Sequence, residues 1–210
     1  MANYMNIYAT QNAYDNDNTK QYPNVSYISG GSVVFANSAP TVFGGLTVHY
    51  MVDSSIISGD VNLFNGGGDS SSASGGGDSE SGGGGAMPTT MIVDGVSETP
   101  INTWRFTEAG EHIVQFEFED NTVPPQFLDG ISIATEAIIG IDITNIGSAA
   151  FNVELTNGAT CLSTTPPVIV DSSAFGGGMG QVYPIYVPSD SVTAYQTAWS
   201  SLSSRITAIQ

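Results

Sequence analysis

The sequence predicts a mainly β protein. A small N-terminal β module, a Gly/Ser tether, a β-meander and a truncated repeat unit follow one another, and one α-helix caps the C-terminus. Three observations predict this class. Short runs that alternate apolar and polar residues recur along the chain, and glycine-containing pairs typical of tight turns separate them. One glycine- and serine-rich stretch divides two such regions. A three- and four-residue apolar spacing, typical of a helix, occupies the last part of the chain.

The N-terminal β module is expected over residues 1–64. The segment "YPNVSYISGGSVVFA" (22–36) places an apolar-rich run on each side of Gly30-Gly31. Glycine accepts the positive φ values of a tight turn, so this segment predicts a β-hairpin. "LTVHYMV" (46–52) alternates Leu, Val, Tyr and Val with Thr, His and Met, which predicts a half-buried strand, and "DVNLF" (60–64) predicts another.

Two segments of this half of the chain are expected to lack a packed core of their own. The first twenty residues are rich in Asn, Tyr and Asp, and we interpret them as an arm that orders against a partner. The stretch "NGGGDSSSASGGGDSESGGGGA" (65–86) offers almost no apolar side chain to offset the ordering entropy of its glycines. We predict a flexible linker there, with a typical span of about 25 Å, between two independent parts.

A β-meander domain with immunoglobulin-like character is expected over residues 87–130. The segment from residue 90 to 120 predicts a strand, a turn at Asp94-Gly95, a strand, a turn at Ala109-Gly110 and a strand. Alternation in the last strand places aromatic and aliphatic side chains on the buried face and polar ones toward water. The inward residues are Val114, Phe116 and Phe118, and the outward ones are Gln115, Glu117 and Glu119.

A truncated repeat unit is expected over residues 131–210. Short isoleucine-rich strands begin here, and Ala150-Phe151 recurs as Ala174-Phe175 after 24 residues, a period within the leucine-rich-repeat range. Each such repeat buries its apolar face only by stacking on a neighbour. Two copies are too few for a free solenoid, so the meander or a partner chain must cover the open end.

The C-terminal segment "PSDSVTAYQTAWSSLSSRITAIQ" predicts one helix that shields the last strand. Ser189 or Asp190 supplies the start signal, and a carboxylate there complements the helix dipole. The apolar stripe consists of Val192, Tyr195, Trp199, Leu202 and Ile206, spaced three, four, three and four residues apart.

Composition excludes several classes of partner. Three basic residues face twenty acidic ones, for a formal net charge of -17, so the positive surface that nucleic-acid binding requires is missing. An anionic membrane would repel the chain, and no apolar run is long enough to span a bilayer. The N-terminal stretch shows no basic region followed by an apolar one, so we expect no secretory signal peptide. Nine Phe, nine Tyr and two Trp supply enough apolar area for folded parts.

The sequence assigns no catalytic residue. The single Cys161 cannot form an internal disulfide, and as a nucleophile it would need a base. His49 and His112 are the two histidines, and neither sits in a recognisable motif. We therefore expect Cys161 to be a core residue. Pro166-Pro167 would turn the chain after it, so "CLSTTPPVIVDSSAF" predicts the end of a repeat rather than an active site.

No metal or cofactor is predicted either. Asp69, Asp78 and Glu80 lie among glycines, but their spacing fits no calcium loop. "DNDN" (15–18) begins like an EF-hand loop, yet its twelfth position is Ser26 instead of Glu. We interpret these acids as solubilising charge. No Gly-Lys-Ser/Thr follows the glycine runs, so they do not predict a phosphate-binding loop.

Four aromatic side chains raise the question of sugar stacking. Tyr183, Tyr186, Trp199 and Trp104 could stack on a sugar ring, but each also lies at a spacing compatible with a core. We favour the core position. Paired carboxylates for glycoside hydrolysis are defined by their separation in space, and no pair stands out in the sequence.

Five stretches carry a family resemblance. "TTMIVDGV" and "TWRFTEAGEHIVQFEFED" resemble the small β-domain that precedes BspA-like leucine-rich repeats. "ITNIGSAAF" resembles the repeat consensus, and "CLSTTPPVIVDSSAF" with "YPIYVPSDSVTAYQTAWSSLSSRITAI" resembles the terminal unit of these repeat proteins. The resemblance implies a surface protein of gut anaerobes or a fibre or appendage protein of their phages. One degenerate repeat instead of many, and the expected lack of an export signal, favour the phage protein.

These observations predict a non-enzymatic structural protein on a virion surface, a head fibre or another capsid appendage. Its N-terminal region would bind a capsid or tail protein, and its C-terminal region a cell-surface glycan or protein. A homo-oligomer such as a trimer is expected, because small β modules leave edges to cover. The alternative is a fragment of an adhesin on a bacterial cell surface. An enzyme acting on surface polysaccharide ranks last.

Overall fold

The computed structural model describes residues 6–8, 25–29, 32–35, 43–57, 59–65, 87–176 and 182–209. The chain forms two compact units, Met1–Val42 and Phe43–Gln210. Strands are the predominant regular elements among the described residues of both, so the predicted mainly β fold class is confirmed. Most of the expected arm and the expected linker, from residue 66 to 86, lie outside the described residues.

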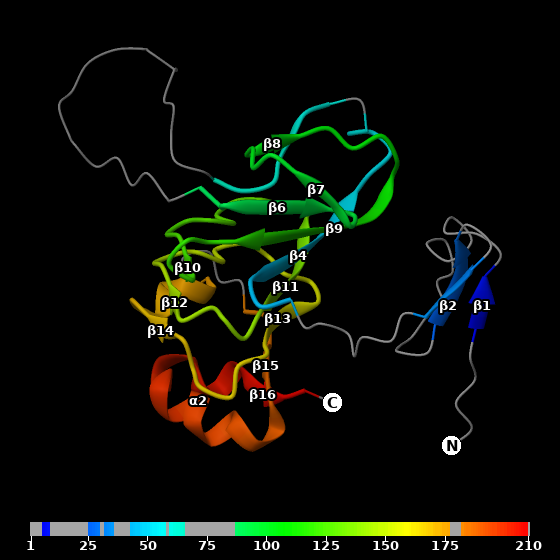
Figure 1. Cartoon of the computed structure of the whole chain (residues 1–210). Coiled ribbons are helices and arrows are strands. Elements are labelled where there is room, and N and C mark those ends of the chain that lie inside the picture. Colours follow the sequence, from blue (N-terminus) through cyan, green and yellow to red (C-terminus); the bar gives the residue numbers. More distant parts are fainter. Residues whose placement is uncertain are drawn as a thin grey trace, which may run out of the picture. The chain divides into compact units, whose positions relative to one another are not determined.

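The N-terminal unit contains a three-stranded sheet in the order β1-β2-β3 (Figure 1). Its strands are β1 (Asn6–Tyr8), β2 (Val25–Ser29) and β3 (Ser32–Phe35). β2 and β3 are antiparallel, with Ser29 opposite Ser32, so the predicted hairpin around Gly30-Gly31 is confirmed. β1 adds to β2 in parallel.

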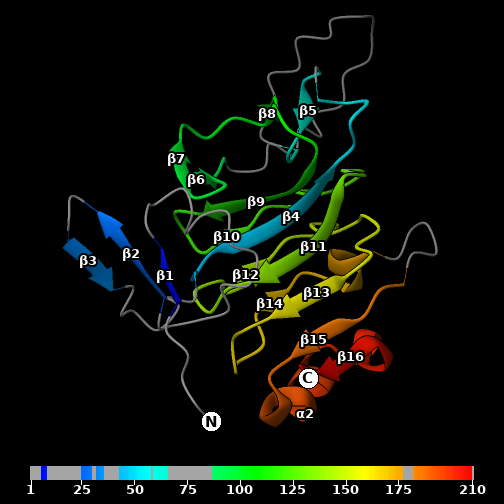
Figure 2. The ribbon, with the colours of Figure 1, turned by 90° about the vertical axis from the view of Figure 1, so that its right-hand side faces the viewer.

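An eight-stranded sheet in the order β16-β15-β13-β11-β4-β9-β6-β7 organises the second unit, and Figure 2 shows it face on. The neighbouring strands β7, β6, β9, β4 and β11 are each antiparallel to the next. The neighbouring strands β11, β13, β15 and β16 are each parallel to the next. The strands are β4 (Leu46–Val52), β6 (Thr90–Val93), β7 (Val96–Glu98), β9 (Gly110–Glu117), β11 (Ala134–Ile139), β13 (Gly158–Cys161), β15 (Ile185–Val187) and β16 (Ile206–Ala208).

Strand β4 corrects the predicted division into domains 1–64, 87–130 and 131–210. It lies between β9 and β11 and joins the two expected C-terminal domains in one sheet. Its alternation is as predicted, but its buried face packs into the core of the second unit instead of an N-terminal module. β5 (Val61–Asn62) also belongs there, paired with β8 (Thr103–Trp104).

The position of β4 also changes the interpretation of the glycine-rich stretch. The Asn65 N–H donates to the Phe127 carbonyl, and the Thr89 N–H donates to the Glu117 carbonyl, each over 2.8 Å. The chain therefore leaves and re-enters the same unit on the two sides of residues 66–86. The predicted tether between domains is wrong, and this stretch joins β5 to β6 within one fold.

The predicted meander is partly rearranged. β6 and β7 form a hairpin whose turn residues, Asp94 and Gly95, have φ values of 50° and 83°, as the predicted turn requires. However, β9 pairs with β6 rather than continuing from β7, and it shares the large sheet with β4, so residues 87–130 form no separate immunoglobulin-like domain. The alternation around β9 is confirmed, with Val114, Phe116 and Phe118 buried.

The repeat unit consists of stacked coils. Parallel strands β11, β13 and β15 form one wall, and β10 (Thr122–Val123), β12 (Asn145–Ile146) and β14 (Val168–Ile169) form a second parallel ladder behind them (Figures 1 and 2). Leu128, Phe151 and Phe175 lie buried at corresponding places, because the Leu128 N–H donates to the Ala150 carbonyl and the Phe151 N–H donates to the Ala174 carbonyl. The rings of Phe151 and Phe175 stack with centroids 5.3 Å apart. The predicted stacking of repeated units in this region is therefore confirmed.

Both ends of this stack are covered within the chain. At the first coil, Phe127 packs against Phe64, Phe116 and Phe118, with ring centroids 4.9 to 5.3 Å apart. These residues come from the β5 region, from β9 and from the position directly after β9, so the meander side covers this end as predicted. At the last coil, the C-terminal helical segments provide the cover.

The C-terminal helix is shorter than predicted. The stripe from Val192 to Ile206 crosses α2 (Val192–Ala198), a 3₁₀ segment η3 (Ser200–Arg205) and β16, because Trp199 (φ -111°, ψ 54°) ends the α-helix. The serine-rich residues that follow have weak helix propensity. The expected start at Ser189 opens a short 3₁₀ turn, η2 (Ser189–Ser191), and another, η1 (Ser172–Phe175), precedes it in the chain.

The stripe nevertheless provides the cap. Tyr195, Trp199, Leu202 and Ile206 are buried. The Trp199 indole N–H donates to the Pro167 carbonyl over 3.0 Å, which fixes the cap to the last coil. Among the described residues, no helix combines the length and the apolar character needed to cross a bilayer.

Candidate binding surface

The structure separates the residues that the sequence singled out for nucleophilic chemistry. Cys161 lies in β13 and is fully buried, as predicted for a core residue. Burial raises the pKa of its thiol well above the ordinary range, so the thiol does not ionise near neutral pH. Neither histidine is a hydrogen-bond partner of this thiol, and both have carboxylate neighbours of their own.

His112 holds the β6–β7 turn. Its Nδ1 lies 2.7 Å from a carboxylate oxygen of Asp94, and its Nε2 lies 3.0 Å from the Glu108 carbonyl oxygen. The ring stacks on Phe106 with centroids 4.2 Å apart. Because both nitrogens and one ring face are occupied, His112 has a structural role.

The four aromatic candidates for sugar stacking have different positions. Tyr183 and Trp199 are buried, which confirms the predicted core position for these two. Trp104 is half-buried and packs against the edge of the core. Tyr186 is also half-buried and lies in β15, where Thr160 and Thr207 are its partners in the neighbouring strands.

One face of the large sheet packs on the core, and the opposite one, here called the open face, carries a continuous row of side chains. Strand alternation and register place these residues side by side from β6 to β16. Seven strands at about 4.8 Å spacing give this central row a width of roughly 29 Å. It consists of Ile92, Gln115, Thr47, Ile138, Thr160, Tyr186 and Thr207.

A cluster of ionisable side chains lies beside the central row on the same face of the sheet. The Nδ1 of His49 is 2.9 Å from a carboxylate oxygen of Glu111 in β9 and 3.9 Å from one of Glu136 in β11. The His49 side chain is 17% exposed, whereas that of Glu111 is 51% exposed. Beside this group, Met51 and Ile113 are also exposed. The open face thus combines an uncharged row with an acidic margin.

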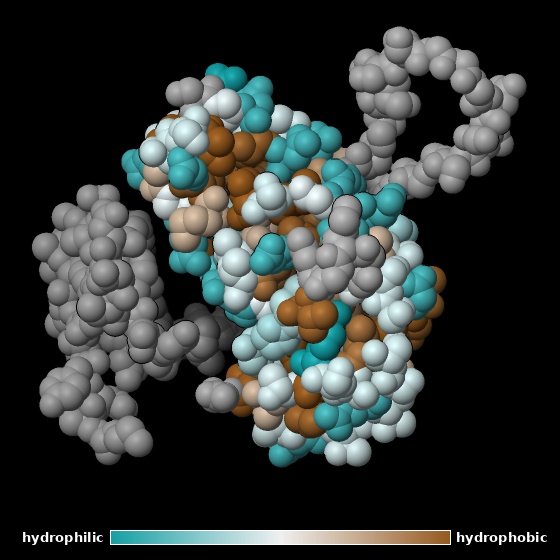
Figure 3. All heavy atoms as spheres, turned by 180° about the vertical axis from the view of Figure 1, so that it is seen from behind, coloured by the Kyte–Doolittle hydropathy of each residue, from teal (hydrophilic) through white to brown (hydrophobic). Residues whose placement is uncertain are grey.

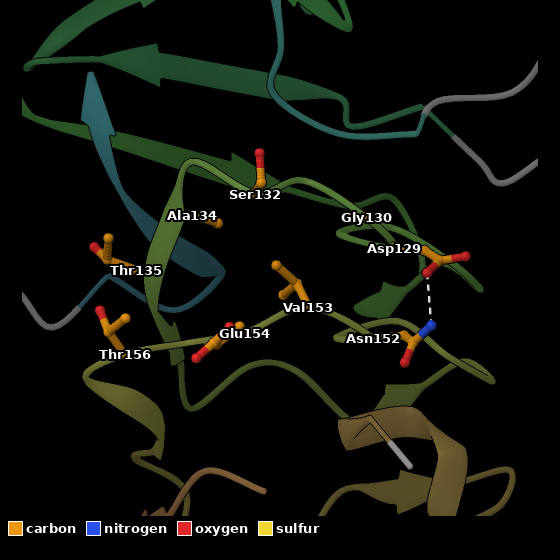
Figure 4. Close-up of a pocket in the computed structure, with 9 residues that line it drawn as sticks. All are labelled: Asp129, Gly130, Ser132, Ala134, Thr135, Asn152, Val153, Glu154 and Thr156. Atoms are coloured by element: carbon orange, nitrogen blue, oxygen red, sulfur yellow. Dashed lines mark hydrogen bonds between the residues drawn. The ribbon is translucent and has the colours of Figure 1, made fainter. Parts of the chain in front are cut away.

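A pocket of about 320 Å³ opens at the amino end of β11 (Figure 4). One wall comes from the approach to β11, and the other from the loop that precedes β13. At one end of the pocket, the Asn152 side-chain N–H donates to the Asp129 carboxylate over 2.7 Å. The lining residues are Asp129, Gly130, Ser132, Ala134, Thr135, Asn152, Val153, Glu154 and Thr156.

The acids that we interpret as solubilising charge rather than as calcium ligands lie outside the described residues: Asp69, Asp78, Glu80 and residues 15–18. Within the described ranges, no group of three or more His, Cys, Asp or Glu side chains is arranged to hold a metal ion.

Sequence reasoning missed the two surface features. The central row could have been found in part, because the outward residues of each alternating strand are its members. The pocket could not, since its walls come from two coils whose relative register the sequence does not reveal. Neither a scan of protein-family models nor a search of curated proteins returns a match for this chain.

Proposed function

We propose that this chain is a non-enzymatic structural protein of a phage virion, a head fibre or another surface appendage, whose C-terminal unit binds a cell-surface glycan or protein. The observation that carries the binding role is the open face with its central row. Hydroxyl, amide, aliphatic and phenolic side chains alternate there over seven strands, and no Lys or Arg belongs to the row. Apart from Thr47, which is buried, these side chains are half-buried or exposed, so the row offers both hydrogen bonds and apolar contact to a macromolecule.

The division of the chain supports attachment by one part and display by the other. Residues 1–42 form a compact unit of their own, so this unit is the one we assign to a capsid or tail protein. The second unit, from residue 43 onward, then carries the binding surface. Several copies on one particle would raise the local concentration of weak binding sites near a cell.

The arrangement of chemical groups supports a role without catalysis. Cys161 is buried in β13, while His112 is fixed in the β6–β7 turn. His49 lies on the open face between two carboxylates. No pair of these groups forms the contact between nucleophile and base that covalent catalysis uses.

We further propose that several copies of this chain form a homo-oligomer. β7 forms one edge of the large sheet, and Val96 within it is 59% exposed. Figure 3 shows apolar side chains at the surface in the upper part of the second unit, where β6 to β8 lie. An exposed strand edge with apolar side chains is a surface that a second copy can cover.

Immunogold electron microscopy tests the location. An antibody raised against residues 43–210 is applied to purified phage particles and to uninfected bacterial cells. Label at regular positions on particles is expected. Label confined to uninfected cells would overturn the virion assignment and favour the adhesin.

A charge-insertion variant tests the binding surface. Thr160→Arg places a cation in the middle of the central row, and Glu119→Arg places the same side chain at an exposed position outside it. We expect Thr160→Arg to weaken cell binding by about tenfold or more, because a charge desolvated at an interface costs at least 1.4 kcal/mol. Equal binding by both variants would remove the open face from the proposal.

A further inference from the structure

A β-bulge contributes to the wall of the pocket at the amino end of β11. The register between β11 and β4 shifts between Ala134 and Glu136, which leaves Thr135 as the extra residue. The Thr135 hydroxyl donates to the His49 carbonyl over 3.2 Å, and its carbonyl accepts from the Asn157 N–H over 2.9 Å. Hydrogen bonds on both sides therefore fix the bulge, so the pocket is a built feature of the sheet.

The floor of the pocket is apolar. Ala134 is 1% exposed and Val153 is 4% exposed, and Figure 4 shows both side chains directed toward the space between the two walls. Because both belong to the core, the floor is rigid.

Polar groups surround this floor. The Asp129 carboxylate accepts from Asn152 at one end, while the Asp129 carbonyl accepts from the Asn65 side chain over 2.6 Å. Glu154 and Thr156 are exposed and lie in the opposite wall. The pocket therefore presents an apolar base with hydroxyl, amide and carboxylate groups around it.

This distribution identifies the class of ligand. Among the described residues, neither Arg105 nor Arg205 lines the pocket, so an anion would find no counter-charge from these side chains. A pyranose ring has an apolar face of C–H groups and a periphery of hydroxyls, which matches the floor and the surrounding polar groups. We infer that the pocket binds one neutral monosaccharide unit, and this inference rests on the proposed function in surface binding.

Size and charge favour this ligand over the alternatives. A volume of about 320 Å³ is at the lower end of the range for small-molecule sites, which suits one ring rather than an oligosaccharide. A cationic ligand would lose hydration against the apolar floor, while the Asp129 carboxylate is already hydrogen-bonded and Glu154 is exposed to solvent. Within the part of the chain that the structure describes, no aromatic ring lines the pocket, so we expect no stacking contribution and an affinity for a single sugar in the millimolar range.

Nuclear magnetic resonance on the ¹⁵N-labelled full chain tests the inference. The probes are methyl glycosides of neutral hexoses, deoxyhexoses and N-acetylhexosamines, each titrated to millimolar concentration. We expect at least one to shift the amide resonances of Gly130, Asn152 and Glu154 in a saturable manner. Glu154→Ala should weaken that sugar's binding by about tenfold, the effect of one hydrogen bond to a carboxylate. Glu119→Ala removes an exposed carboxylate outside the pocket and should leave the affinity unchanged.

Three results would overturn the inference. Saturable shifts with methylammonium but with no glycoside would identify a cation site. No shift with any probe would show that the pocket is not a site for these ligands. Equal weakening by Glu154→Ala and Glu119→Ala would place the sugar elsewhere. Each result is distinct from failure of the proposed function, because immunogold labelling reports the location of the protein whatever the pocket binds.

Discussion

Removing the segment that contains β4 should unfold the C-terminal unit. A fragment of residues 87–210 contains both domains that the sequence predicts after the linker, whereas a fragment of residues 43–210 contains the unit that the structure defines. The first lacks six side chains that are at most 2% exposed in the folded unit: Leu46, Val48, Tyr50, Val52, Leu63 and Phe64. It also leaves the inner edges of β9 and β11 without a partner strand.

The size of this loss follows from burial. Each large apolar side chain contributes about 1.5–3 kcal/mol, so the six together contribute roughly 9–18 kcal/mol. A whole domain is stable by about 5–15 kcal/mol. The contribution of this segment therefore matches or exceeds the entire free energy of unfolding, and the shorter fragment should not fold.

Purified fragments 43–210 and 87–210 are compared by ¹H–¹⁵N correlation spectra and by thermal unfolding followed by circular dichroism. We expect dispersed resonances and a cooperative transition for 43–210, and neither for 87–210. A dispersed spectrum and a cooperative transition for 87–210 would refute the reasoning, because they would show that the meander and the coils close a core without β4.

Three further predictions concern the coils and their cap. Trp199→Ala should destabilise the unit by about 3–5 kcal/mol in urea unfolding, because it empties a core site and leaves the Pro167 carbonyl without its donor; a change below 1 kcal/mol would show that the cap is dispensable. Cys161 should react with a thiol reagent only after denaturation, since burial raises its pKa and closes access; rapid labelling of the native protein would contradict this. The Asp171 pKa is lowered by hydrogen bonds from the hydroxyl and N–H of Ser173, so its stabilising effect is present above about pH 4 and is lost as pH falls through the lower folded-state value. Urea midpoints of the natural chain and Asp171→Asn should therefore converge at low pH, and a constant difference would exclude this origin.

Local features were predictable from the sequence because they depend on neighbouring residues. The strand over 46–52 follows from strict alternation, and the turn at Asp94-Gly95 follows from residues that accept positive φ. The coils follow from the recurrence of Phe151 and Phe175. In each case one short pattern contains the physical cause.

Strand partners were not predictable in the same way. Alternation in β4 shows that one face is buried but does not show against which segment. Its neighbours lie beyond a glycine-rich stretch that has the composition of a domain boundary, so β4 was assigned to the wrong side. The length of the C-terminal helix was overestimated for a related reason. A three- and four-residue apolar spacing also fits a 3₁₀ turn that leads into a strand.

The candidate surfaces depend on those partners. Thr160 and Tyr186 belong to one row only because β13 and β15 are in register. Thr135, which lines the pocket, is a bulge residue because of how β11 pairs with β4. Alternation indicates some outward residues of the row, but the sequence alone does not show which strands are neighbours, and it contains no signal for the pocket.

The central place of β4 has a consequence for synthesis. Hydrogen bonds that join this strand to its neighbours link residues 68 and 86 positions apart, as between Thr47 and Gln115 and between His49 and Thr135. Translation at about 5–20 residues per second leaves β4 without its second neighbour for on the order of ten seconds. During that time an apolar strand edge is exposed on the ribosome-bound chain, where it can pair with another copy. Asp53, exposed directly after the strand, is the kind of charged residue that discourages such pairing. Strand β4 is therefore the first strand of the sheet to be synthesised, although it lies in the middle of the sheet. It is paired on both sides only after β11 has been made.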